Sequence, residues 1–89
     1  LQAAAKLHAP ESGRLLEVFT TQPAVQIYTG NWLAGCPVAK CGRSYFDYEG
    51  VAIECQHCPD SPNKPEYPTT VLRPGETFEE AIIWQFSVV

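Results

Sequence analysis

Residues 51–56, which read Val51-Ala52-Ile53-Glu54-Cys55-Gln56, alternate in the manner of a β-strand. Successive side chains of a strand point to opposite faces, so Glu54 shares a face with Gln56 and lies opposite the larger apolar side chains. A lone carboxylate in so apolar a strand is costly unless its face is wet, paired or functional. We therefore identify Glu54 as a candidate general base. The competing interpretation is a half-exposed strand with Glu54 in solvent.

Pro, Gly and Asn divide the rest of the chain into short runs rich in β-branched and aromatic residues, which predicts an all-β fold. Residues 14–21 and 25–29 are predicted strands, the first apolar on both faces and therefore covered on both sides. Residues 77–88 fit helical and strand spacing alike, but their composition favours a strand. Residues 1–7 are also predicted as a strand, although their alanines taken alone favour a helix.

The segments between these runs have the character of loops. Residues 32–47 form an irregular connection, and residues 59–68 hold four of the eight prolines, which excludes a central strand or helix there. The run Arg73-Pro74-Gly75-Glu76 fits a type II turn, with Pro and Gly at the two central positions.

Net charge and composition limit the partners. The chain carries six Lys plus Arg against ten Asp plus Glu, with a formal net charge of −4 and no basic cluster. Nucleic acids and anionic membrane surfaces both require a basic patch, so we expect no nucleic acid and no membrane partner. No apolar run approaches the length of a membrane span. The four cysteines fit a reducing cytoplasm or an oxidising compartment equally well.

The absence of methionine, including at position 1, indicates that this chain does not begin at its own translation start. We expect a processed product or part of a longer polypeptide, in which residues 1–89 form a single segment.

Two further groups of residues invite a chemical role. Gln26 is a polar amide between Val25 and Ile27, and an amide that both donates and accepts suits a sugar hydroxyl, although a solvated strand residue is the commoner case. The four cysteines raise the hypothesis of structural zinc or of a disulfide such as Cys36–Cys41, but ordinary free thiols are the favoured interpretation. His8 and His57 are interpreted as surface residues. No phosphate loop or nucleophile elbow is present.

From about Ser12 onward the chain resembles the last third of the galactose mutarotases, or aldose 1-epimerases. The resemblance rests on four motifs that occur in order with matching gaps. They are Ser12-Gly13-Arg14 with Leu16-Glu17-Val18 and Thr20-Thr21; Val25-Gln26-Ile27-Tyr28-Thr29-Gly30-Asn31; Ile53-Glu54-Cys55-Gln56-His57 with Pro59-Asp60-Ser61-Pro62-Asn63; and Val71-Leu72-Arg73-Pro74-Gly75-Glu76-Thr77-Phe78.

The resemblance implies the C-terminal part of a large antiparallel β-sandwich that interconverts the α and β anomers of aldoses such as galactose and glucose, with no cofactor. By motif match, Glu54 is the general base that takes the proton of the C1 hydroxyl, and Gln26 hydrogen-bonds the sugar. The family's acid histidine, its second substrate-binding histidine and its substrate-binding arginine and aspartate lie upstream of this chain. We therefore expect the upstream part of the same enzyme, or a companion chain, as a partner.

Two alternatives remain at this point, a non-catalytic carbohydrate-binding β-sandwich module and a small zinc-stabilised β module. Cys55 stands where the family commonly has Thr, which marks it as an incidental substitution. We also expect a set of large apolar side chains to join a core that missing strands complete. The set is Leu15, Phe19, Ile27, Ile53, Ile82, Trp84 and Phe86.

Overall fold

The computed structural model describes residues 1–89 and contains five strands and one short 3-10 helix. The elements are β1 (Gln2–Ala9), β2 (Arg14–Thr20), β3 (Ala24–Tyr28), β4 (Ala52–Gln56), η1 (Ser61–Asn63) and β5 (Ile82–Val88). Every strand pair is antiparallel and no α-helix is present, which confirms the predicted all-β class. No helix has the length and apolar character needed to cross a membrane.

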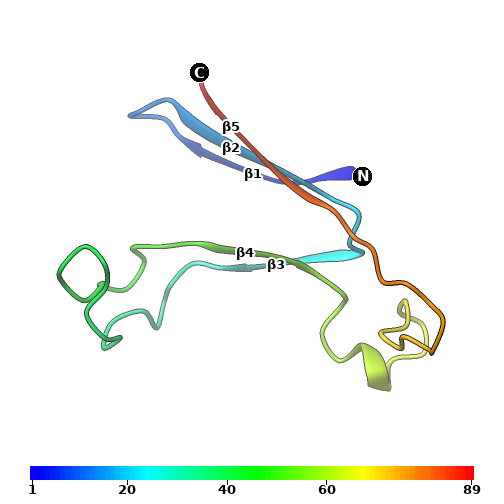
Figure 1. Ribbon diagram of the computed structural model, residues 1–89. Coiled ribbons are helices and arrows are strands. Elements are labelled where there is room, and N and C mark those ends of the chain that lie inside the picture. The colour runs from blue at the N-terminus through cyan, green and yellow to red at the C-terminus, as the bar shows by residue number, and fades with distance from the viewer.

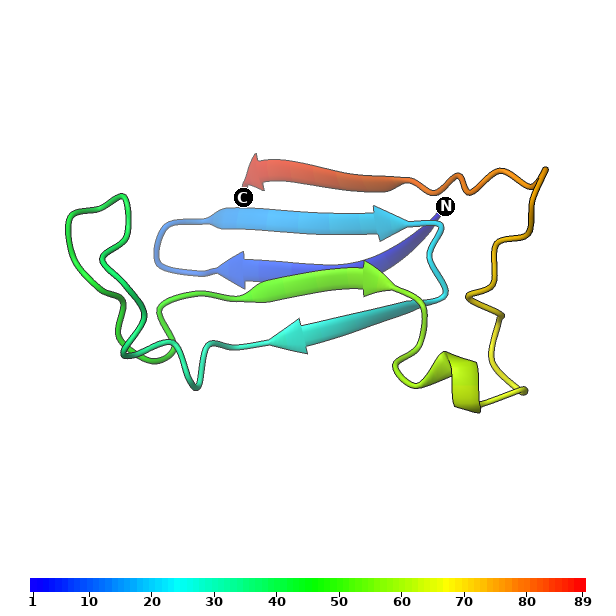
Figure 2. The same ribbon diagram turned by 60° about the horizontal axis from the view of Figure 1, so that its bottom comes forward.

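The strands form two separate sheets. One is three-stranded in the order β1-β2-β5, and the other is the pair β3-β4. Figure 1 shows them as two layers that come together where β2 leads into β3, and Figure 2 shows that the strands of both layers run in similar directions. A closed β-sandwich remains a prediction.

The β1–β2 hairpin depends on a glycine in its turn. Gly13 has a φ of +73°, and a Cβ built there would lie 2.4 Å from the Val89 carbonyl oxygen. The Val89 N–H donates to the Gly13 carbonyl at 2.8 Å, so the last residue of the chain closes on this turn. Only glycine combines the left-handed backbone with so close an approach.

The two threonines at the end of β2 hold the beginning of β5. The Thr20 hydroxyl donates to the Ala81 carbonyl at 3.1 Å, the Ala81 N–H donates to the Thr21 hydroxyl at 2.8 Å, and that hydroxyl donates to the Glu80 carboxylate. β2 ends at Thr20, which pairs with Ile82, so the residues before Ile82 have no partner in the β2–β5 ladder. The predicted strand over residues 77–88 is therefore present only from residue 82 onward.

The interior of the molecule is small. Leu15 and Val18 of β2 are the buried hydrophobic residues, and they lie on opposite faces of the central strand, as the pattern of β2 predicted. Trp84 and Phe86 of β5 are 48% and 71% exposed. The radius of gyration is 16.7 Å, whereas a compact domain of this length has about 12 Å. Large apolar side chains thus remain open to solvent on both sheets.

The loops follow the turn chemistry of the sequence. Gly75 has a φ of +86°, and the Glu76 N–H donates to the Arg73 carbonyl at 3.0 Å. Because the ring of Pro74 keeps its φ negative, this turn is the predicted type II. Residues 59–68 contain no strand, but they do form the single 3-10 turn η1. Pro62 lies in its first turn, where a missing N–H has little cost.

Candidate functional site

Gln26 and Glu54, the two residues singled out in the sequence, are direct partners in the β3–β4 ladder. Directly opposed residues of an antiparallel pair have Cβ atoms about 4.5–5.5 Å apart, so both side chains reach one small ligand. Both residues are exposed. The competing prediction, that Glu54 would lie in solvent on a half-exposed strand, thus describes its surroundings in this structure.

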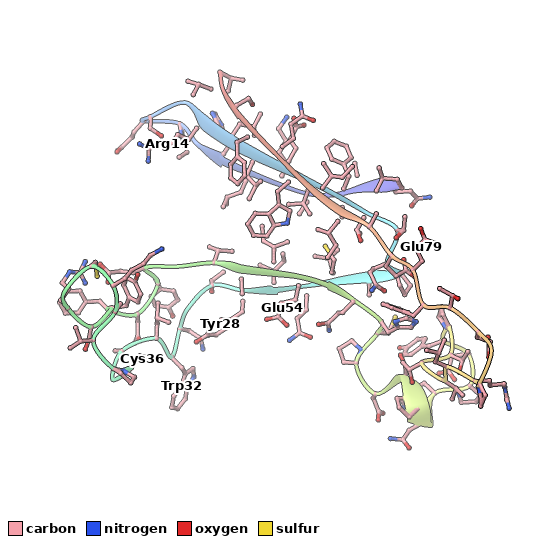
Figure 3. All side chains as sticks on the ribbon, viewed as in Figure 1. Arg14, Tyr28, Trp32, Cys36, Glu54 and Glu79 are labelled. Carbon is pink, nitrogen blue, oxygen red and sulfur yellow. The ribbon has the colours of Figure 1, made fainter.

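The face that carries this pair is polar, and the opposite face is apolar. Alternation along the two strands puts Tyr28 and Gln56 on the face of Gln26 and Glu54. Figure 3 shows Glu54 and Tyr28 on the side of the β3–β4 ribbon that is turned away from the three-stranded sheet. The site therefore lies on the outer surface of the two layers. The apolar side chains of β3 and β4 point the other way, toward the three-stranded sheet.

Gln56 is a residue of this face that sequence reasoning did not select. Its Nε2 donates to the Gln26 Oε1 at 3.4 Å. This bond occupies the carbonyl end of the Gln26 amide and leaves the Nε2 of Gln26, with two N–H donors, open to a ligand. Strand alternation, which singled out Glu54, could also have identified Gln56, because it places both side chains on the same face.

The carboxylate of Glu54 makes no hydrogen bond and no ion pair with the rest of the chain. The three ion pairs of the structure are Lys6–Glu17, Arg43–Glu49 and Lys64–Asp60. All acceptor positions of Glu54 are therefore open, next to the N–H donors of Gln26. An acceptor beside a donor, both on a rigid ladder, is suited to hold a hydroxyl group and to take its proton.

Gly30 fixes the distance between the ends of β3 and β4. Its φ is +80°, and a Cβ would lie 2.8 Å from the Gly50 carbonyl oxygen. The Gly30 carbonyl accepts the N–H groups of Leu33 at 3.2 Å and Tyr48 at 2.8 Å. The two ends of the connection over residues 31–49 are thus joined directly beside the site, which keeps Gln26 and Glu54 in register.

An ion pair orders the outer part of this connection. Arg43 donates from Nη1 and Nη2 to the two carboxylate oxygens of Glu49, each at 2.8 Å, and its guanidinium lies 5.4 Å from the centre of the Phe46 ring. The Phe46 N–H also donates to Glu49, at 2.7 Å. The hydrogen bonds from Arg43 and Phe46 lower the pKa of Glu49 to about 2. The same pairing raises the pKa of Arg43.

A pocket of about 390 Å³ lies between this connection and the strands. Tyr28 and Ala52, the cross-strand pair next to Gln26–Glu54, form part of its wall, together with Leu33, Tyr45 and Glu49. The Tyr28 hydroxyl accepts the Trp32 N–H at 3.0 Å, which draws the start of the connection onto the polar face.

The loop after β4 is closed by its own polar groups. The buried Ser61 donates its hydroxyl to the Cys58 carbonyl, and the Asn63 amide donates to the Asp60 carboxylate at 2.6 Å. Asp60 has a φ of 65°, a left-handed conformation that Asp adopts more readily than most residues. The motif from Pro59 to Asn63 is thus explained by the turn that it forms.

The four cysteines are free thiols in the structure, Cys36 and Cys41 exposed and Cys55 and Cys58 half-buried. No group of three or more His, Cys, Asp or Glu side chains is placed to hold a metal ion. His8 lies exposed on β1, and His57 follows β4. Neither histidine belongs to the strand positions that carry the polar face.

Comparison with known proteins agrees with the four motifs. The family model described as Aldose 1-epimerase matches residues 1–85. The chain is 46% identical over 84 residues to a galactose mutarotase of Rattus norvegicus and to one of Homo sapiens, with 94% of this chain and 25% of each relative covered. An aldose 1-epimerase of Escherichia coli is 40% identical over 87 residues, with 96% and 25% covered.

The chain thus spans about a quarter of the length of the curated relatives that it matches. The family model covers nearly the whole chain, including the strands that carry Gln26 and Glu54. On this agreement, the chain belongs to the aldose 1-epimerase family.

Proposed function

We propose that this chain supplies the general base and one sugar-binding side chain of an aldose 1-epimerase, which interconverts the α and β anomers of aldohexoses such as galactose and glucose. Family membership supports the reaction class. The observation that carries the assignment of residues is the direct pairing of Gln26 with Glu54 on an exposed polar face.

In the proposed reaction Glu54 takes the proton from the C1 hydroxyl of the sugar. The C1–O5 bond breaks, the C1 oxygen becomes the carbonyl oxygen of an open-chain aldehyde, and O5 receives a proton from an acid. Rotation about C1–C2 turns the other face of the carbonyl toward O5, and the reverse proton transfers close the ring. The N–H donors of Gln26 hold a neighbouring hydroxyl while the ring is open.

The polar face of β3–β4 carries no histidine, and its side chains beside Glu54 are two glutamines and a tyrosine. The family resemblance assigns the role of the acid to a histidine outside residues 1–89. We therefore propose that the upstream part of the same enzyme, or a companion chain, completes the site. The exposed Trp84 and Phe86 and the large radius of gyration support a partner that covers this apolar surface.

Polarimetry of freshly dissolved α-galactose tests the function. The protein at its natural length, with any polypeptide that accompanies it, is compared with its Glu54→Gln variant. Loss of the catalysed rate in the variant supports the proposal. Sugar binding without any acceleration by the unmodified protein would favour a carbohydrate-binding module instead.

A further inference from the structure

Two cysteines lie at the end of the strand that carries the proposed base. Cys55 directly follows Glu54 in β4, and Cys58 lies three residues further on, after the strand has ended at Gln56. Two cysteines at this Cys-x-x-Cys spacing form the reversible disulfides of redox proteins. The motif is not used by the proposed reaction, although it begins directly beside the residue that carries it.

Both thiols are free and half-buried, so both are open to a small oxidant. Cys55 belongs to the β3–β4 ladder, where it pairs with Val25. Cys58 belongs to no strand. The chain bends at His57, and the Cys58 carbonyl accepts the Ser61 N–H at 3.2 Å. One cysteine is therefore fixed by the sheet, and the other lies in the loop that follows it.

A disulfide between these cysteines changes the end of β4. Disulfide-bonded residues have Cα atoms about 4.4–6.8 Å apart, whereas an extended chain spans about 10 Å over three residues. Gln56 is one of the two residues between the cysteines, and in the ladder it is extended and pairs with Ala24. We expect closure of the bond to turn the chain at Gln56 and to take this residue out of the ladder.

Removal of Gln56 from the ladder reaches the candidate site directly. Its Nε2 donates to the Gln26 Oε1 at 3.4 Å, a contact that requires both residues on the same face of the pair of strands. Without this contact the Gln26 amide is free to rotate away from Glu54. The other end of the ladder is held by the close approach of Gly30 to Gly50, so the change stays at the end that carries the glutamines.

From this arrangement we infer that Cys55 and Cys58 form a redox switch, in which a reversible disulfide withdraws Gln56 from the polar face and lowers the activity of the site. The inference rests on the proposed function for the activity that is lowered. The family commonly has Thr at the position of Cys55, so the switch belongs to this chain and is not implied by the resemblance.

The oxidant in this step is hydrogen peroxide. One thiolate attacks a peroxide oxygen, so that an S–O bond forms and the O–O bond breaks. The products are a sulfenic acid and hydroxide, which takes up the proton lost by the first thiol. The second thiol attacks the sulfenic sulfur, the S–S bond forms, the S–O bond breaks, and water leaves. Two thiols are thus oxidised to one disulfide while one peroxide is reduced to two waters. A dithiol reductant reverses the change by thiol–disulfide exchange.

Peptide mapping and NMR test the switch without relying on turnover. The natural-length protein, with any polypeptide that accompanies it, is treated with a small excess of hydrogen peroxide. We expect the peptide that holds Cys55 and Cys58 to become lighter by two hydrogen atoms and the side-chain NH₂ resonances of Gln26 to shift. Mutarotation of galactose should slow at least about threefold, as for the loss of one hydrogen bond that holds Gln26. Dithiothreitol should restore all three.

Cys58→Ser and Cys55→Thr each remove one partner of the disulfide and should make the Gln26 resonances and the rate insensitive to peroxide. The double variant Cys36→Ser with Cys41→Ser is the matched control, because it removes the two exposed thiols, and it should stay sensitive. Absence of the Cys55–Cys58 disulfide, Gln26 resonances that do not shift when it forms, or mutarotation that it leaves unchanged would overturn the switch. A reversible disulfide that shifts Gln26 in a protein without mutarotation would leave the redox change standing and contradict the proposed function.

Discussion

Gln26 of β3 and Glu54 of β4 face each other across the β3–β4 ladder, and the side-chain amide of Gln56 donates to the side-chain Oε1 of Gln26 on the same face. The long connection between the two strands returns because Gly30 lies against Gly50 and its carbonyl accepts the Tyr48 N–H. A proposed base and a proposed sugar-binding amide are thereby held side by side by backbone hydrogen bonds.

The first prediction concerns the two glutamines. Gln26→Leu removes the donors that hold a sugar hydroxyl, so we expect KM for galactose to rise about tenfold, as for the loss of one good hydrogen bond. Gln56→Leu only frees the Gln26 amide to rotate, and we expect a rise of about threefold. Steady-state mutarotation measures both. A larger effect from Gln56 than from Gln26 would contradict the proposed order of contacts.

The second prediction concerns the ionisation of Glu49. Its pKa is lowered to about 2 by hydrogen bonds from Arg43 and Phe46. Because the pKa of Glu49 is lowered in the folded state, the ion pair stabilises this loop fully at pH values above the ordinary glutamate pKa of about 4.3. This stabilisation is lost as the pH falls through about 2. The chemical shift of the Phe46 amide should therefore titrate near pH 2.

Arg43→Gln is the control for this titration, because it removes the guanidinium and leaves the carboxylate in place. In the variant we expect the midpoint of the Phe46 amide shift to move up toward about 4.3. A midpoint that is the same in both proteins would show that Arg43 does not set the ionisation of Glu49.

The third prediction compares two glycines of positive φ. Gly13 and Gly42 have φ values of +73° and +87°, but a Cβ at Gly13 collides with the Val89 carbonyl whereas a Cβ at Gly42 meets no atom within 4 Å. Each Ala substitution carries the left-handed cost of about 1–2 kcal/mol. We expect Gly13→Ala to lower the free energy of unfolding in urea by at least about 1 kcal/mol more than Gly42→Ala does. Equal losses would contradict the close approach of the C-terminal residue.

The fourth prediction concerns the hydroxyl that holds β5. Thr21 accepts the Ala81 N–H and donates to Glu80, so Thr21→Val removes two hydrogen bonds with little change in shape. We expect a loss of about 1 kcal/mol in the free energy of unfolding. Thr70→Val, at an exposed loop threonine without such bonds, should stay within about 0.5 kcal/mol. Similar losses at both positions would mean that the hydrogen bonds of the Thr21 hydroxyl do not stabilise β5.

Much of the fold could be predicted from local chemistry. Alternation located β2, β3 and β4, and Pro74 followed by Gly75 identified the type II turn. The N-terminal boundary of β5 could not be found in this way, because it depends on where β2 ends and on the Thr20 and Thr21 hydroxyls, which lie far away in the sequence.

The candidate site was also predictable only in part, because the sequence identifies its residues but not their contacts. Alternation singled out both Glu54 and Gln26, and the family motifs assigned their roles, but only the register of the ladder shows that they are partners. The Arg43–Glu49 pair and the pocket depend on how an irregular connection folds back on the strands. No periodic signal in the sequence reports such contacts.

We propose Glu54 as the general base of an aldose 1-epimerase. Polarimetry of fresh α-galactose with the natural-length protein tests it most directly, with Glu79→Gln as the control for an exposed glutamate outside the polar face. We expect Glu54→Gln to lower the catalysed rate by about 10²–10⁴-fold and Glu79→Gln to leave it unchanged. An unchanged rate in Glu54→Gln, with the same folded structure, would contradict the assignment.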